Sequence, residues 1–245
     1  MTNRHTIVLP VVLVSFISIF VVACFHDDND APTAAPPPPE MASFQVTVSN
    51  LTNAQPLSPI AVIGHGEGYR TFAVGSAASA GLEELAEGGD NAALLAEAAA
   101  NAATAVTGAG AGPIAPAGSE TVAIELLESE LADFRISVST MLVNTNDAFT
   151  GLDSISVGSL AVGDSLDFHA IAYDAGTEAD TELATDIPGP AAAGEGFNTM
   201  RNDLANHVSM HPGIVSLDDG LTTSVLTNQH RFDNPVAGIR IERID

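Results

Sequence analysis

The chain has 245 residues, with 31 acidic and 7 basic side chains and a formal net charge of −24 at pH 7. This charge excludes binding of nucleic acid or an anionic membrane through a basic face. It fits a salt-adapted acidic surface or the binding of cations. Tryptophan is absent, which disfavours a carbohydrate-stacking surface, and the single cysteine, Cys24, excludes an intramolecular disulfide.

Residues 1–24 are predicted to be a lipoprotein signal peptide. Arg4 supplies a positive start, an apolar run follows, and Val21-Val-Ala-Cys24 resembles a lipobox. The alternative is an uncleaved membrane anchor, but acidic residues rather than a basic stop signal follow the cysteine. Cys24 is therefore the expected lipidation site. We expect the protein in the cell envelope, in the outer membrane or at the cell surface. If the host is a Gram-negative bacterium, Phe25 rather than Asp after the cysteine favours the outer membrane over retention in the inner membrane.

Residues 25–42 are predicted to be a disordered tether, because they are rich in Asp and Pro and contain no core-forming pattern. Residues 43–245 are predicted to be one domain, since about 200 residues can bury a full core.

Short alternating segments predict an all-β fold, an antiparallel β-sandwich with short helical insertions. A short helix is expected at 79–87, capped by Ser76 or Ser79 and ended by Gly88 and Gly89, and a second one at 90–104, capped by Asp90. In chain order, strands are expected at 44–50, 60–63, 120–126, 135–143, 155–162, 165–172 and 236–244.

Two of these strands end in acidic loops, at 144–153 and 173–180. If the two strands pair in one sheet with their loops at the same end, Asp147, Asp174 and Glu178 converge, with Gly176 allowing a sharp turn. Converging carboxylates repel one another unless a cation lies between them, and a hard cation such as Ca²⁺ prefers oxygen ligands. The alternative is that these residues only form turns. Further candidates around the site are Asn144, Asn146, Asp153 and Asp180.

The two loops also resemble the spondin domain, whose pattern has an Asp-aromatic-x-x-Gly loop and a later Asp-Ala-Gly-Thr-Asp. Here Asp147, Phe149 and Gly151 fall close to the first part, and Asp174-Ala-Gly-Thr-Glu178 gives the second, with Glu in place of the last Asp. The resemblance extends from Phe44 to Ile244, more weakly after Pro188. It implies a C2-like sandwich with calcium at one end, and a non-catalytic adhesion or binding module. The expected partner is an unidentified extracellular or envelope protein or a matrix ligand, and no residue of this sequence specifies which.

Two other functions are open. His207 and His211 could bind zinc in a metal-dependent hydrolase, with His230 as a third imidazole, but no Glu follows His207 and Pro212 disfavours a helix there. No G-x-S-x-G nucleophile elbow is present. The protein is therefore not expected to be an enzyme. The third possibility is a purely structural envelope lipoprotein.

Overall fold

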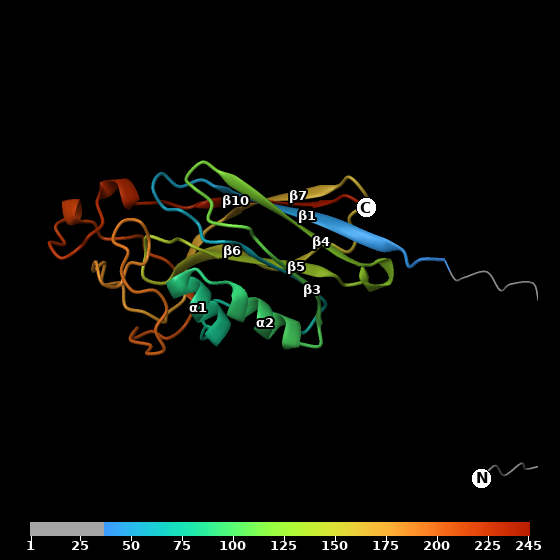
Figure 1. Cartoon of the computed structure of the whole chain (residues 1–245), viewed down its shortest axis with the longest axis horizontal. Coiled ribbons are helices and arrows are strands. Elements are labelled where there is room, and N and C mark those ends of the chain that lie inside the picture. Colours follow the sequence, from blue (N-terminus) through green and yellow to red (C-terminus); the bar gives the residue numbers. More distant parts are fainter. Residues whose placement is uncertain (1–36) are drawn as a thin grey trace, which may run out of the picture. The chain divides into compact units, whose positions relative to one another are not determined.

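The predicted all-β sandwich is confirmed by the computed structural model, which describes residues 37–245 (Figure 1). These residues contain two antiparallel sheets and two α-helices, and Pro39–Asp245 forms one compact unit. The predicted signal peptide, Cys24 and most of the predicted tether lie outside the described residues.

The four-stranded sheet has the order β4-β1-β10-β7. Its strands are β1 (Met41–Asn50), β4 (Ser119–Leu127), β7 (Ser165–Ala170) and β10 (Ala237–Arg243). In β1, alternate residues Phe44, Val46 and Val48 are fully buried, as the period of two in the sequence predicts. Because β1 is central, it hydrogen-bonds along its length to β4 on one side and to β10 on the other.

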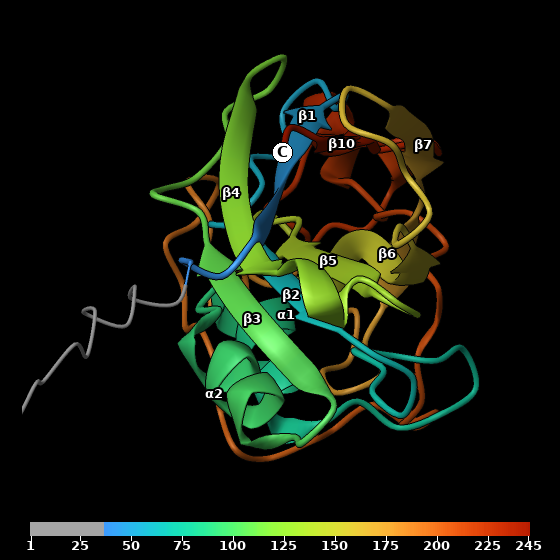
Figure 2. The same cartoon turned by 90° about the vertical axis from the view of Figure 1, so that its right-hand side faces the viewer.

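The six-stranded sheet has the order β3-β2-β5-β6-β8-β9. Its strands are β2 (Ala61–His65), β3 (Thr104–Ala109), β5 (Arg135–Met141), β6 (Ala148–Ser156), β8 (Ala172–Asp174) and β9 (Ser209–Met210). One face packs on the four-stranded sheet around Phe44 and Phe134, whose ring centroids lie 5.6 Å apart. The other face lies against the helices, so β2 is buried on both faces (Figure 2).

The first helix, α1 (Ala80–Gly88), has the predicted caps: the Ser79 side chain accepts a hydrogen bond from the Leu82 N–H, and Gly89 takes a left-handed conformation. The second, α2 (Ala92–Ala100), is shorter than predicted and its N-cap is Asn91 rather than Asp90. The residues from Thr104 onward instead form β3, because pairing with β2 outweighs the helical preference of the preceding alanines. Three short 3₁₀ helices are η1 (Glu128–Glu130), η2 (Leu217–Asp219) and η3 (Asn228–His230).

Strand β6 corrects two predictions. It begins at Ala148, inside the predicted loop 144–153, and ends at Ser156, so the predicted strand 155–162 is wrong except at its start. Gly151 explains the close pairing with β5, since a Cβ there would lie 1.9 Å from the Val138 carbonyl oxygen. The predicted strand 165–172 is also divided: β7 lies in one sheet, and after Ile171 the chain continues as β8 in the other.

Residues 175–236 contain few regular elements and form long loops at one end of the sandwich, away from the end where the chain enters β1 (Figure 1). Three buried side chains hold these loops in a small core of their own: Ile187, Ile214 and Leu226. The acidic loops predicted from the sequence lie at this end.

Candidate functional site

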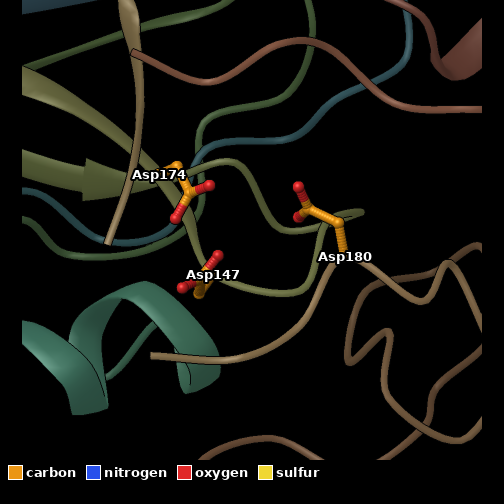
Figure 3. A group of neighbouring side chains, drawn as sticks. All are labelled: Asp147, Asp174 and Asp180. Carbon is orange, nitrogen blue, oxygen red and sulfur yellow. The ribbon is translucent and has the colours of Figure 1, made fainter. Parts of the chain in front are cut away.

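Three carboxylates meet where β6 begins and β8 ends. Asp147 directly precedes β6, and Asp174 is the last residue of β8, opposite Ala148 in the ladder. One carboxylate oxygen each of Asp147, Asp174 and Asp180 lies within 4.8 Å of the others, and the three side chains surround one space (Figure 3). The predicted convergence of Asp147 and Asp174 is thus present, although it arises from β6 and β8 pairing rather than from the two predicted strands sharing a sheet.

Asp147 is the most buried of the three, with no exposed surface. Its Oδ2 accepts hydrogen bonds from the backbone N–H groups of Thr177 and Glu178, at 2.8 and 3.1 Å, and from the Thr177 hydroxyl at 3.1 Å. Its Oδ1 is buried and has no hydrogen-bond partner among the described residues. A buried oxygen without a donor is costly, so this atom points to a missing partner.

Asp174 is fixed by the turn that follows it. Its Oδ1 accepts a hydrogen bond from the Gly176 N–H at 2.6 Å. Gly176 has a φ of 71°, and a Cβ there would lie 2.5 Å from the backbone of His207. The sharp turn predicted at Gly176 is therefore confirmed, and no side chain fits at this position.

The electrostatics of the three carboxylates favour a cation. Burial and the charge of Asp174 raise the pKa of Asp147 to about 7. Burial and the charge of Asp180 raise the pKa of Asp174 above its ordinary value. Both groups are therefore hard to ionise together unless a positive charge compensates them, and a divalent cation would do so. The residues present fit such an ion, since the site offers oxygen atoms and one of them lacks any other partner.

Glu178, a predicted ligand, is not part of this group of three. Its backbone N–H donates a hydrogen bond to Asp147. Its side chain is buried close to two other acidic residues, Glu87 and Asp186. Burial, the charge of Glu87 and the charge of Asp186 raise the pKa of Glu178 to about 8. The third carboxylate of the group is instead that of Asp180, which was predicted only as a candidate around the site.

Replacement of Glu178 by glutamine is expected to stabilise the calcium-free protein at pH 9 by about 2–4 kcal/mol. The pKa of this group is about 8 in the folded state and 4.5 unfolded, so its stabilising proton is fully present below pH 4.5 and is lost as the pH rises through 8. Glutamine mimics the protonated acid at every pH, so the two proteins should be equally stable at pH 4.

Urea unfolding in EGTA at both pH values measures this difference. Glu125→Gln, on the exposed face of β4, is the matched control and should change little. An equal effect of Glu178→Gln at pH 4 and pH 9 would contradict the titration.

The other candidates around the site have structural partners. The Asn144 side chain accepts a hydrogen bond from the Ala191 N–H, and that of Asn146 accepts one from the Glu182 N–H. Asp153 lies within β6 and accepts a hydrogen bond from the Thr71 N–H, which removes it from the site. These hydrogen bonds hold the surrounding loops together.

The three histidines do not assemble as a metal centre. Among residues 37–245, no histidine belongs to a group of three side chains close enough to share an ion. His207 is exposed and its Nδ1 lies 2.8 Å from the Ala205 carbonyl oxygen. His230 accepts a hydrogen bond from the Thr227 N–H. The His211 Nε2 lies 3.6 Å from Asp180 Oδ1.

The Spondin_N family model matches residues 50–193, more than half of the chain. The chain belongs to the spondin N-terminal domain family. The match includes all three carboxylates of the site and ends before His211. A comparison with curated proteins found no match.

Membership of the spondin family supports a non-catalytic binding module, since spondin domains are generally not enzymes and are typically extracellular or secreted. In the part of this spondin domain that the structure describes, no helix is long and apolar enough to cross a membrane.

Proposed function

We propose that this spondin domain is an exported, lipid-anchored binding module whose loop end is held by a calcium ion. Asp147, Asp174 and Asp180 would hold the ion. The observation that carries the proposal is the fully buried Asp147, which has one oxygen without a partner and two further carboxylates beside it. Cys24 would carry the lipid that anchors the chain to the cell envelope.

Calcium suits the site better than a transition metal, because the three close side chains offer only carboxylate oxygens. Carbonyl oxygens and water would complete the six to eight oxygen ligands that calcium usually takes. The charge of −24 also favours a cation at any concave acidic position.

The ion would connect three separate parts of the loop end: the turn before β6, the end of β8 and the loop that contains Asp180. Without the ion these carboxylates repel one another, and the loops lose a common attachment. A partner that binds this end would therefore bind more tightly with calcium. The partner class we propose is an extracellular or envelope protein or a matrix component.

Calcium at 100 times its dissociation constant is expected to stabilise the protein by about 2.7 kcal/mol. For a domain of this size, the melting temperature should rise by about 5–10 °C. Thermal unfolding of the full chain in detergent, with calcium and with EGTA, measures the shift.

Asp174→Asn should abolish the shift. Asp133→Asn should keep it, because Asp133 is exposed and precedes β5 at the end of that strand away from the site. An unchanged melting temperature of the wild-type protein in calcium would contradict the proposal and favour a purely structural lipoprotein.

A further inference from the structure

We propose that His211 is the positioning residue of the calcium site and holds Asp180 in place for ligation through its Nε2–H. The proposal rests on the calcium site proposed above. The His211 side chain has no exposed surface, and its Nε2 has no hydrogen-bond partner among the described residues. Asp180 Oδ1 lies 3.6 Å from this nitrogen.

The hydrogen bond that His211 Nδ1 accepts determines whether Nε2 carries a proton. The Gly213 N–H donates to His211 Nδ1 at 3.0 Å, so Nδ1 carries no proton and Nε2 must carry it. A protonated Nε2 donates a hydrogen bond and has no lone pair for a metal. His211 therefore acts on the carboxylate of Asp180 and is not itself a ligand.

The ring is held by the fold around it. The backbone N–H of His211 donates to the carbonyl oxygen of Ala172, the first residue of β8, at 3.0 Å. The imidazole lies against the ring of Phe232, with centroids 5.5 Å apart. These contacts fix the direction of Nε2 independently of the carboxylates.

Asp180 needs such a partner more than the other two carboxylates do. Asp147 accepts three hydrogen bonds, and Asp174 accepts one from Gly176. Asp180 lies on an irregular loop with 32% of its side chain exposed, and His211 Nε2 lies 3.6 Å from its Oδ1. A hydrogen bond from a buried donor orients a carboxylate and reduces the entropy lost when it binds an ion.

The arrangement extends the site beyond the part of the chain that the family model matches. His211 lies after residue 193, so the segment around β9 would complete a site whose carboxylates all come from the matched region. Loss of a hydrogen-bonded partner of a metal ligand typically weakens metal binding 10–100-fold.

Calcium titration calorimetry on the full chain in detergent tests the role with three variants. His211→Phe keeps a ring but removes the donor, and should weaken calcium binding 10–100-fold. His211→Gln places an amide N–H near the position of Nε2 and should stay within a few-fold of wild type. His207→Phe, on the exposed neighbouring histidine, is the matched control and should leave binding unchanged.

A double-mutant cycle distinguishes the positioning of Asp180 by His211 from a purely structural role of His211. Asp180→Asn alone should weaken binding, and adding His211→Phe should weaken it no further. An equal extra loss in the Asp180→Asn background would overturn the proposal.

The wild-type protein supplies a measurement that does not depend on the folding of a variant. In ¹⁵N NMR of the calcium-bound protein, His211 Nε2 should keep its proton. A deprotonated Nε2, or wild-type calcium affinity in His211→Phe, would overturn the positioning role. Failure of the wild-type protein to bind calcium would instead overturn the calcium site itself.

Discussion

Replacement of Asp147 by asparagine is expected to stabilise the protein in EGTA and to abolish its stabilisation by calcium. Asparagine keeps an oxygen that accepts the hydrogen bonds of Thr177 and Glu178, and it removes the buried charge. The variant should therefore be more stable than wild type without calcium. In saturating calcium the wild type should gain stability and the variant should not.

The direction and size of the stabilisation expected for Asp147→Asn in EGTA follow from the pKa of Asp147. Burial and the charge of Asp174 raise this pKa from 3.8 to about 7. An acid with a raised pKa stabilises the folded state while it is protonated, and this contribution is lost as the pH rises from 3.8 through 7. At pH 8 the calcium-free wild type has lost it. Asp147→Asn should then raise the free energy of unfolding by about 2–4 kcal/mol.

Urea unfolding at pH 8, with EGTA and with calcium, measures both effects in one series. Asp133→Asn, at an exposed position, is the control and should match wild type in each condition. A variant that is less stable than wild type in EGTA would show that Asp147 is not a repulsive charge in the calcium-free protein.

Replacement of Phe134 by alanine is expected to lower the free energy of unfolding by about 3–5 kcal/mol. Phe134 is 1% exposed and packs between the two sheets against Phe44. The space it leaves is bounded by strands on both sides, so it cannot collapse without separating the sheets. A loss of this size is a large part of the total stability of a domain.

Urea unfolding in EGTA measures the loss, and Val162→Ala, at a position 62% exposed, should change stability by less than about 0.5 kcal/mol. Phe134 directly precedes β5, at the end of that strand away from the carboxylates. Calcium should therefore stabilise Phe134→Ala by the same free energy as wild type. A loss below about 1 kcal/mol would mean that the two sheets can close around the missing ring.

The sequence predicts the sandwich best where a strand is long and half-buried. The alternation in β1 and β10 and the caps of α1 were each readable from local residues. Strand β3 could not be predicted, because its alanines, threonines and glycine show little alternation of apolar and polar residues. This strand forms through its pairing with β2. The start of β6 was not predicted, because Asp147 and the asparagines before it are typical of a turn. The observed turn is shorter than the number of these residues indicates, and the strand begins directly after Asp147.

The site was predictable only in part. Asp147 and Asp174 could be found because each lies in an acidic loop that follows a predicted strand. The antiparallel pairing of β6 with β8, which brings the two residues together, was not predicted. The choice between Glu178 and Asp180 depends on the path of an irregular loop, which sequence spacing does not determine. His211 approaches the site through β9, a strand of two residues whose pairing with β8 no periodic pattern indicates.

The central position of β1 has a mechanical consequence. The chain enters the domain at Met41, at one end of the sandwich, while the acidic site lies among the loops at the other end (Figure 1). A pull between an anchor before β1 and a partner bound at the site would run along this strand. The backbone hydrogen bonds to β4 and β10 would then be sheared all together rather than opened one after another. The fold thus places its most extensively paired strand in line with the tension that an anchored adhesion module would carry.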